Sequence, residues 1–271
     1  MISIIIIQYN SQELTTQAID SIKKHLTGNY EIIVVDNASP NSDLEQLLSA
    51  HQDINLIRNK ENYGFGKANN IAAEQAKGDI FLFLNNDTIV KSNFIPFVES
   101  CFENEQDLGG LAPKLLNADG TLQISVGPLP SIVTEFWVKF SSNLFYRKRE
   151  PFLSYFNKYY STCHDVDFAT GAAFFMKKNT FEIIEGFDEN IFMYFDDSIL
   201  CKKIKELGFR IHYTPEFEIT HYGGASWNEQ ITTFLEKHYR KSQLYYYKKY
   251  RPAIENFLLR IYLKLANKEM D

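Results

Sequence analysis

Polar side chains follow several apolar runs in the amino-terminal third of the sequence, and each could contribute to a ligand site. Tyr9 and Asn10 come after the first run, Asp36 after the second, and Asn85 and Asp87 after the fourth. In an open parallel sheet, ligands bind outside the carboxyl ends of the strands. One such polar group is typical of a turn or a helix cap. Their recurrence after three strands predicts a binding edge.

Asp87 and His221 are the candidates for holding a metal ion. Asp87 directly follows a buried strand, where its carboxylate could bind Mg²⁺ or Mn²⁺, since hard cations prefer oxygen ligands. Such an ion would bridge a substrate diphosphate. His221 stands at a strand end before the loop 222–226. A lone histidine is ordinarily structural, and the specific alternative is a second ligand for the same ion.

Asp196 and Asp197 are adjacent carboxylates at the start of a predicted amphipathic helix, behind the aromatic run 192–195. An aspartate at a helix amino terminus caps free N–H groups and suits the helix dipole, which explains one of the two without any catalysis. The other could serve as a general base in a partly desolvated site.

The segment 62–70 is a glycine-bearing loop that leads into a helix, where backbone N–H groups could meet an anion. It is not a dinucleotide fingerprint, because the third glycine is missing and the loop follows the third strand instead of the first. A flexible turn with a helix cap is the alternative.

The elements that must position these residues alternate between short apolar runs and helical patterns. Asn10 with Glu13 resembles a capping box that opens a helix to about Leu26, and Ser39-Pro40 opens another helix. This βαβα start predicts a right-handed, mostly parallel sheet flanked by helices. The predicted strands are 2–7, 31–35, 54–57, 79–84, 166–176, 210–214 and 217–221, and a later helix covers 196–207.

Composition excludes several classes of protein. The 271 residues are 45% apolar and 23% charged, which suits one large α/β domain or a domain with an appendage. A net charge of −6 gives no global attraction to nucleic acid. Three widely spaced cysteines read as free thiols of a reducing compartment. Without a signal peptide or a spanning segment, the protein is expected to be soluble or membrane-peripheral.

The carboxy-terminal part becomes helical from about Glu229 and carries an unusual charge pattern. Residues 237–251 contain six Lys or Arg and no acid, so this segment is +6 and the rest of the chain is −12. Tyrosines are interleaved with the charges, and such an aromatic-basic helix suits an anionic bilayer surface. The alternative is a solvated basic face or a dimer contact that packs onto the domain.

Taken together, these motifs resemble the family 2 inverting glycosyltransferases of the GT-A fold. The similarity is greatest to the bacterial rhamnosyltransferase-like branch, which builds O-antigen and other surface polysaccharides. The resemblance spans roughly residues 2–226. Its carriers, in family order, are Ile4–Ser11, Val34–Ser39, Asn62–Asn70, Asn85–Thr88, Gly186–Glu189, Asp196-Asp197 and His221–Ser226.

The resemblance implies a GT-A domain over residues 1–226, with a Rossmann-like nucleotide-binding half, and a helical appendage over 227–271. It also implies a role for each motif residue. The nucleotide would be bound by Tyr9 stacking near the base, Asp36 hydrogen-bonding it, the loop residues Asn62, Gly64 and Asn69 closing over the nucleoside, and Asn85, which replaces the first acid of the family's D-x-D motif.

The catalytic roles implied by the resemblance fall on four residues. Mg²⁺ or Mn²⁺ would be held by Asp87 and His221, and Asp197 would be the catalytic base. Asp196 stands where the family has glutamate and would orient the acceptor. The implied donor is a nucleoside diphosphate sugar, TDP-rhamnose as first choice, and the implied acceptor is a lipid-linked saccharide at the cytoplasmic face of the inner membrane.

Two other functions fit parts of the pattern. A nucleotidyltransferase on a related fold would also bind a nucleotide and Mg²⁺, but it should carry a glycine-rich basic loop after the first strand, and Gln8–Ser11 is not one. A catalytically inactive sugar-nucleotide-binding scaffold is the second alternative. The joint presence of Asp87, Asp197 and His221 argues against it.

Overall fold

The computed structural model describes residues 1–40, 44–223 and 229–266. Its amino-terminal half is built on four parallel strands in the order β3-β2-β1-β4, crossed by helices. All four strands were predicted from their apolar runs. The strands are β1 (Ile2–Gln8), β2 (Tyr30–Asp36), β3 (Asn55–Arg58) and β4 (Ile80–Asn85), and the helices are α1 (Gln12–His25), α2 (Leu44–Ala50) and α3 (Phe65–Gln75).

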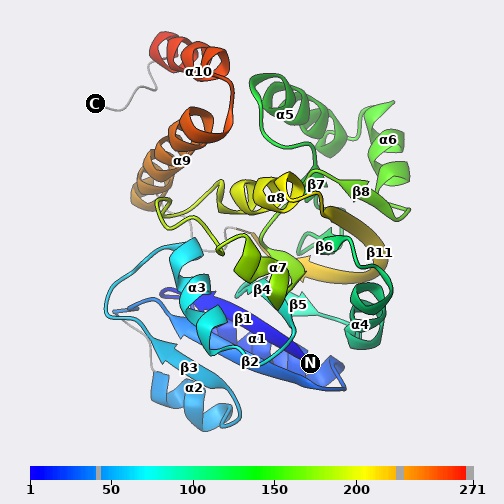
Figure 1. The fold of residues 1–271 in the computed structure, drawn as a ribbon, viewed down its shortest axis with the longest axis vertical. Coiled ribbons are helices and arrows are strands. Elements are labelled where there is room, and N and C mark those ends of the chain that lie inside the picture. Colours follow the sequence, from blue (N-terminus) through cyan, green and yellow to red (C-terminus); the bar gives the residue numbers. More distant parts are fainter. Residues whose placement is uncertain (41–43, 224–228, 267–271) are drawn as a thin grey trace.

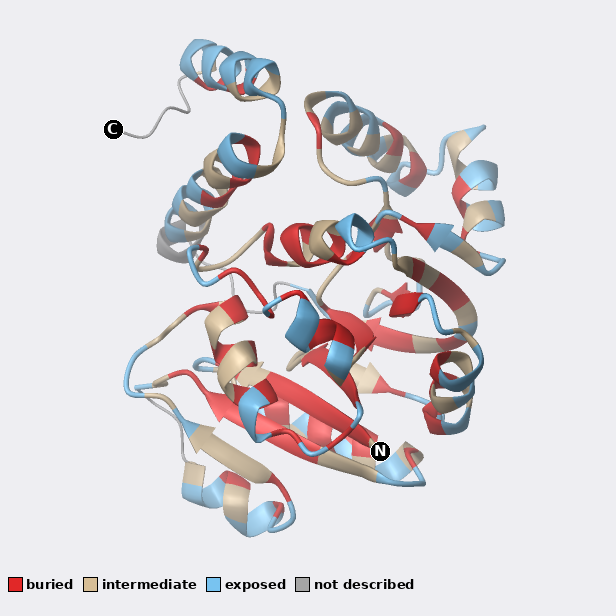
Figure 2. Ribbon diagram, in the orientation of Figure 1, coloured by how far each residue is buried: buried red, intermediate tan, exposed pale blue. Residues whose placement is uncertain are grey.

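The central strands are buried on both faces, which explains why their sequences are apolar without alternation. Ile4 and Ile6 of β1 pack in one cluster with Ile19 and Ile22 of α1. Ile5 lies in the other cluster, with Ala68 and Ala72 of α3. Helices therefore cover both faces of the sheet, and its strands form the buried centre of the molecule (Figures 1 and 2).

The predicted helix starts need correction. The helix α1 begins at Gln12, with Ser11 at the N-cap position and no side-chain cap hydrogen bond, so the capping box from Asn10 is wrong. Asn10 has a left-handed φ of 52° and donates its N–H to the Ser39 hydroxyl instead. The predicted cap at Ser39-Pro40 runs into residues 41–43, which lie outside the described part, and α2 is described from Leu44.

The carboxy-terminal half extends the sheet with mixed pairing. The sheet order continues from β4 as β10-β6-β11-β5, and β8 also pairs with β11. β10 is antiparallel to β4 and β6, whereas β6 and β11 are parallel. The α/β class is confirmed, with parallel pairing limited to β1–β4 and to the β6–β11 pair. These strands are β5 (Thr88–Val90), β6 (Leu108–Leu116), β8 (His164–Val166), β10 (Ala173–Lys177) and β11 (Arg210–His221).

Three strand predictions in this half had the wrong bounds. The predicted strand 166–176 is divided among β8, β9 (Phe168–Ala169) and β10, and β9 pairs with β7 (Val126–Gly127) in a separate small sheet. The predicted strands 210–214 and 217–221 are one strand, β11, whose register shifts between Thr214 and Glu218. The interruption seen in the sequence is therefore an irregularity in the pairing of β11 with β6.

The remaining helices surround the sheet and extend one end of the molecule, where α5, α9 and α10 lie (Figure 1). The helix predicted over 196–207 is confirmed as α8. Among the described residues, no helix combines the length and apolarity needed to cross a bilayer. The helices are α4 (Ile95–Asn104), α5 (Ile132–Tyr146), α6 (Phe152–Tyr159), α7 (Lys178–Ile183), α8 (Asp196–Glu206), α9 (Glu229–Tyr250) and α10 (Ala253–Leu265).

The aromatic residues of the basic segment pack onto the domain. Tyr246 and Tyr247 of α9 are buried in a third cluster with Ile191, Phe195 and Ile199. Tyr239, Leu244, Tyr245 and Tyr250 are partly buried against the same cluster. These aromatic side chains therefore contribute to packing α9 onto the domain.

Candidate functional site

The strand register brings the predicted binding residues to one edge of the sheet. Gln8, the last residue of β1, pairs with Asp36 of β2, and its neighbour Ile7 pairs with Asn85 of β4. The Gln8 amide donates to Asp36 Oδ1 at 2.7 Å, which fixes a buried carboxylate at this edge. Tyr9 follows with 47% of its surface exposed, so its ring is free to contact a ligand.

Asp87 and His221 meet although they are far apart in the sequence. β5 and β11 are antiparallel, and Thr88 pairs with His221, so the imidazole stands beside the turn that carries Asp87. His221 Nε2 lies 3.2 Å from Asp87 Oδ1 and 3.2 Å from Asn85 Nδ2. The two side chains are 14% and 15% exposed, which leaves them partly accessible from outside.

A glutamine that no motif marked orients His221. His221 Nδ1 lies 2.8 Å from Gln123 Oε1, and the Gln123 amide nitrogen donates to Asn117 Oδ1 at 3.0 Å. Because this second bond turns the Gln123 oxygen toward the ring, Nδ1 is the donor in this contact, and Nε2 stands between Asn85 Nδ2 and Asp87 Oδ1. A partner of this kind on the far nitrogen is typical of metal-binding histidines.

The donor set fits a divalent cation with open coordination positions. One carboxylate oxygen and one imidazole nitrogen converge here, a combination that Mn²⁺ or Mg²⁺ accepts when other oxygen ligands complete the shell. The described part of the chain has no group of three or more His, Cys, Asp or Glu that could enclose an ion. A cation held by Asp87 and His221 would therefore need oxygen atoms of a ligand or of water.

Asp196 and Asp197 open α8 after a turn with unusual backbone. Tyr194 and Phe195 both have left-handed φ values, 65° and 63°, a conformation that is costly for such side chains and recurs at functional sites. Asp197 accepts hydrogen bonds from the N–H of Ser198 at 2.7 Å and of Gly171 at 3.3 Å. The Asp197 carboxylate thus faces Gly171, in the segment that precedes β10.

The two carboxyl groups differ in environment. Asp196 is almost completely buried, and its Oδ1 has no hydrogen-bond partner. Burial, with a further contribution from Asp197, raises the pKa of Asp196 well above its usual range. Burial also raises the pKa of Asp197, while hydrogen bonds from Gly171 and Ser198 oppose that rise. Asp197 keeps part of its surface accessible, as a proton acceptor requires.

The glycine-bearing loop is held by a buried asparagine that sequence reasoning left out of the site. Asn37 Nδ2 donates to Asn62 Oδ1 at 2.8 Å and to the Gly64 carbonyl at 3.1 Å. Asn37 Oδ1 accepts from the Asn59 amide at 3.0 Å and from the Tyr63 N–H at 3.1 Å. One side chain therefore fixes the loop 59–64 at four points.

Gly64 connects this loop to the segment before Asp196. It has a φ of +81°, and a Cβ atom on it would lie 2.0 Å from the Phe192 carbonyl oxygen. The next residue, Phe65, donates its N–H to the same oxygen at 2.9 Å. Asn69 is buried in α3, and its side-chain amide donates to the Phe65 carbonyl at 2.9 Å.

Two consecutive residues join the acidic pair to the cation candidates. The Gly171 N–H donates to Asp197, and the Ala172 carbonyl accepts from the Asn85 N–H at 2.9 Å. Asn85 in turn contacts His221. The predicted base and the predicted metal ligands are therefore neighbours in space. Part of the predicted loop after His221, residues 224–226, lies outside the described part of the chain.

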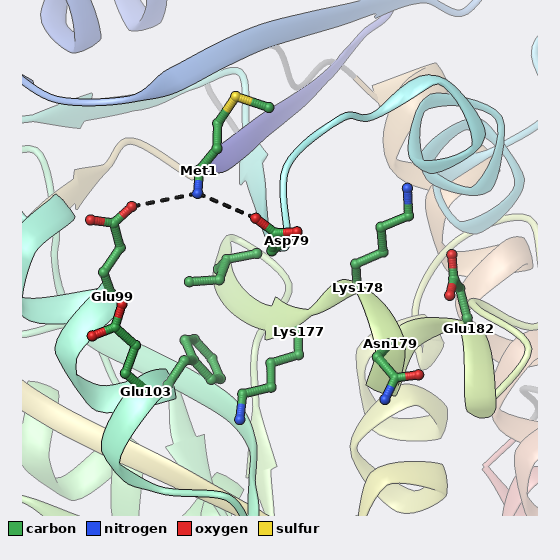
Figure 3. Close-up of a pocket in the computed structure, with 10 residues that line it drawn as sticks. Met1, Asp79, Glu99, Glu103, Lys177, Lys178, Asn179 and Glu182 are labelled. Atoms are coloured by element: carbon green, nitrogen blue, oxygen red, sulfur yellow. Dashed lines mark ion pairs between the residues drawn. The ribbon is translucent and has the colours of Figure 1, made fainter.

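A cavity at the opposite edge of the sheet contains none of the predicted site residues. It lies beside the amino ends of β1 and β4 and is lined mainly by charged side chains, several of them from α4 and α7 (Figure 3). The Met1 amino group there forms ion pairs with Asp79 at 3.5 Å and Glu99 at 3.6 Å. Since β1 starts here and ends at Gln8 beside Asp36, this cavity is separate from the candidate site.

Comparison with known sequences points to one family. Residues 3–108 match the model of glycosyl transferase family 2. The chain is 28% identical over 233 residues to the rhamnosyltransferase WbbL of Escherichia coli (strain K12), with 82% of this chain and 83% of that protein covered. It is 21% identical over 235 residues to the N-acetylglucosaminyl-diphospho-decaprenol L-rhamnosyltransferase of Mycobacterium tuberculosis (strain ATCC 25618 / H37Rv), which covers 79% and 73% of the two chains.

Comparison with solved structures shows the fold. GalNAc-T7 with UDP, GalNAc and Mn²⁺ superposes with a TM-score of 0.63 at 15% identity, covering 89% of this chain and 47% of that one. The mannosyltransferase PcManGT of Pyrobaculum calidifontis, with GDP-Man and Mn²⁺, gives a TM-score of 0.56 at 19% identity, covering 89% and 63%. This chain thus spans about half to two thirds of those structures, and it has the GT-A fold that they share.

Proposed function

The chain is a family 2 glycosyltransferase with a rhamnosyltransferase-like sequence, and we propose that it moves a sugar, L-rhamnose as first choice, from a nucleoside diphosphate to a hydroxyl of a lipid-linked saccharide with inversion. The observation that carries the proposal is the convergence of Asp197 with Asp87 and His221 through Gly171 and Ala172. The similarity to two rhamnosyltransferases supports the choice of sugar.

The donor's nucleoside would be bound at the edge formed by β1 and β2. Tyr9 is exposed and can stack on the base, while the oriented carboxylate of Asp36 accepts hydrogen bonds from it. The loop containing Asn62 and Gly64, held by Asn37, would close over the nucleoside. Asn85 would contact the diphosphate from β4.

Asp87 and His221 would hold Mg²⁺ or Mn²⁺ against the donor diphosphate. Such an ion, when bound, neutralises charge on the departing nucleoside diphosphate. The chain's own part is to present Asp87 Oδ1 and His221 Nε2 side by side, with Gln123 keeping the imidazole in the tautomer that leaves Nε2 unprotonated. Mn²⁺ in the similar GalNAc-T7 and PcManGT structures supports the presence of a divalent ion.

Asp197 would act as the general base. Its carboxylate takes the proton of an acceptor hydroxyl, whose oxygen attacks the anomeric carbon on the face opposite the diphosphate, and the bond to the diphosphate oxygen breaks. A single displacement of this kind inverts the configuration. Asp196, buried beside it, would orient the acceptor. No covalent sugar intermediate is needed, in contrast to enzymes that use a carboxylate nucleophile.

A lipid-linked acceptor would bring the protein to a membrane. We infer a peripheral position at the cytoplasmic face of the inner membrane, in the synthesis of a bacterial surface polysaccharide such as O-antigen. Support comes from the decaprenol-linked substrate in the name of the mycobacterial relative, and from a 27% identical relative, the O-antigen biosynthesis protein RfbC of Myxococcus xanthus, of which this chain covers 17%.

The test is a panel of TDP-, UDP- and GDP-sugars incubated with the purified chain and Mn²⁺, with and without a lipid-linked saccharide. Release of nucleoside diphosphate from one donor, stimulated by acceptor and stopped by EDTA, is the expected result. Donor binding without turnover of any donor would indicate an inactive scaffold. Formation of a nucleotide sugar from a nucleoside triphosphate and a sugar phosphate would indicate a nucleotidyltransferase.

A further inference from the structure

The helix α10 turns its apolar stripe toward solvent. Residues at spacings of three and four form a continuous apolar face along the helix. Their exposed fractions range from 41% for Ile261 to 82% for Leu265. Only Leu259 and Leu263 on another side are buried against the domain. The exposed face consists of Ile254, Phe257, Leu258, Ile261, Tyr262 and Leu265.

The helix α5 also has an apolar stripe that faces solvent. Val133, Phe136, Trp137 and Phe140 follow one another at helical spacing, and all are exposed, with 76% for Val133 and 73% for Phe136. Trp137 and Phe140 also contact Phe152 of α6, which fixes the rings as one aromatic surface. Large contiguous apolar surfaces of this kind on a soluble domain mark a site of interaction.

These two stripes belong to one end of the molecule. The N–H of Ile132, the first residue of α5, donates to Glu255 Oε2 of α10 at 3.3 Å. Ile132 also packs with Leu259 and Leu263 in the third hydrophobic cluster. Figure 1 shows both helices at one end of the molecule, where α9 also lies. We call the two stripes together the α5/α10 face.

The charges around the α5/α10 face have one predominant sign. Residues 132–160 and 253–265 contain seven Lys or Arg and three Asp or Glu. Two of the acids are engaged internally: Glu135 accepts from Tyr247 and Gln243 of α9, and Glu255 accepts from Arg251. The basic residues are exposed, namely Lys139, Arg147, Lys148, Arg149, Lys158, Arg260 and Lys264.

From these observations we propose that the α5/α10 face docks on an anionic lipid bilayer. Helices that lie in a bilayer interface carry a broad apolar face with aromatic residues and a polar side rich in Lys and Arg. A second copy of the chain is a poorer occupant, because a two-fold contact through this face would bring the same excess of positive charge together from both sides. The proposal rests on the proposed function, whose acceptor carries a lipid.

The face also lies close to the candidate site. Gln243 and Tyr247 of α9 bond to Glu135 of α5, and Ser242, next in sequence to Gln243, donates to the Met193 carbonyl at 2.7 Å. Met193 belongs to the turn that leads into Asp196 and Asp197. A bilayer on the α5/α10 face would thus stand one helix away from the acidic pair, where a membrane-anchored acceptor has to present its hydroxyl.

The test is co-sedimentation of the full chain with vesicles of phosphatidylcholine, with and without phosphatidylglycerol. A variant with Phe136→Gln, Phe140→Gln, Phe257→Gln and Ile261→Gln should lose at least about 100-fold in partition to the anionic vesicles. The matched control, Ile183→Gln with Leu207→Gln, removes two similarly exposed apolar residues elsewhere and should bind as wild type does. Salt should weaken wild-type binding.

Donor hydrolysis and circular dichroism in the same preparations establish that the variants are folded. The proposal is overturned if wild type does not sediment with anionic vesicles, if the four-residue variant binds like the control, or if wild type is a dimer that this variant dissociates. Vesicle binding without hydrolysis of any donor would refute the proposed function alone. Hydrolysis without vesicle binding would refute the docking surface alone.

Discussion

Two adjacent carboxyl groups are assigned different tasks because their surroundings differ. Asp197 is held by two backbone N–H groups and remains accessible, whereas Asp196 is buried with an unpaired oxygen. Charge repulsion between the neighbours makes it unfavourable for both to ionise. We therefore propose Asp197 as the group that takes a proton, whereas burial raises the pKa of Asp196 well above its usual range.

Replacing Asp197 by Asn should remove the proton acceptor but preserve the shape of the site. We expect transfer to fall by roughly 10²–10⁴-fold in kcat, with the donor KM nearly unchanged. Because burial raises the pKa of Asp197 above the ordinary 3.8, the acidic limb of the wild-type pH profile should lie above that value. Steady-state kinetics over pH measure both effects, and a variant within threefold of wild type would contradict the role of Asp197.

Replacing Asp196 by Asn should change how the stability of the protein depends on pH. A carboxyl whose pKa is raised on folding stabilises the protein below its unfolded pKa, and this contribution is lost as pH rises through the folded pKa. The pKa of Asp196 is raised, so the melting temperature of the Asn variant should increase relative to wild type as pH rises from acid to neutral. Thermal unfolding over that range measures this change, and a constant difference in melting temperature would argue against a raised pKa of Asp196.

The chemistry at the residue scale was only partly visible in the sequence. Asp36, Asp87 and Asp197 were predicted because each follows or precedes a recognisable element, so local patterns locate them. Gln123 and Gly171 were not predicted, although each contacts a predicted site residue. Their contacts come from segments distant in sequence, and neither stands in a pattern that separates it from an ordinary loop residue.

At the scale of elements, the site depends on how loop 59–64 is attached to the turn before α8. Asn37 fixes the loop, and the Phe192 carbonyl accepts the Phe65 N–H directly beside Gly64. The approach is so close that only a residue without a side chain fits at Gly64. A change at Gly64 therefore acts on loop 59–64 and on the turn before the acidic pair together.

Gly64→Ala should displace the loop or the turn before α8, because its Cβ would overlap the Phe192 carbonyl oxygen. The matched control is Gly120→Ala, which has nearly the same φ, +80°, and no atom within 4 Å of the added Cβ. The control should show only the backbone strain of about 1–2 kcal/mol. Gly64→Ala should lose more stability than the control and should raise the donor KM. If the two variants behave alike in thermal unfolding and donor kinetics, the attachment of loop 59–64 to the turn before α8 is refuted.

Strands with a continuous apolar run could be predicted from the sequence, whereas strands shaped by tertiary contacts could not. The runs that form β1 to β4 are continuous and apolar, so the parallel half of the sheet followed from the sequence. β6 was missed because Gly109, Gly110 and Pro113 interrupt its run. Gly110 is needed there since a Cβ would lie 2.3 Å from the Phe174 ring of the neighbouring β10. That constraint is tertiary and leaves no periodic pattern.

At the scale of the whole molecule, α9 is fastened to the domain by a buried carboxylate. Asp188 Oδ2 accepts from Lys249 at 2.8 Å, from Tyr245 at 2.8 Å and from Tyr250 at 3.0 Å. Burial opposes its ionisation, but the hydrogen bonds from Lys249 and Asn190 outweigh that effect and lower the pKa of Asp188. Lys249, one of the six basic residues predicted to face a membrane, thus forms an ion pair within the protein.

Lys249→Met should loosen α9, since it leaves the buried Asp188 without its positive partner. We expect a loss of about 1–3 kcal/mol of stability at neutral pH. Because the pKa of Asp188 is lowered on folding, this difference should be lost as pH falls through its folded-state pKa. The neighbouring Lys248 is exposed, so Lys248→Met is the control and should change little. Chemical denaturation of both variants measures the effect, and equal stabilities would contradict the fastening.

We propose above all that Asp87 and His221 hold a cation that the protein needs in order to use a nucleoside diphosphate sugar. The most direct measurement is Mn²⁺-dependent release of nucleoside diphosphate from the preferred donor, in wild type and in Asp87→Asn. Since loss of a mere supporting partner of a metal ligand costs about 10–100-fold, loss of the ligand itself should cost at least about 100-fold. We expect release to stop with EDTA and to fall by this factor in the variant. Release that persists in EDTA and in Asp87→Asn would contradict a cation held by Asp87 and His221.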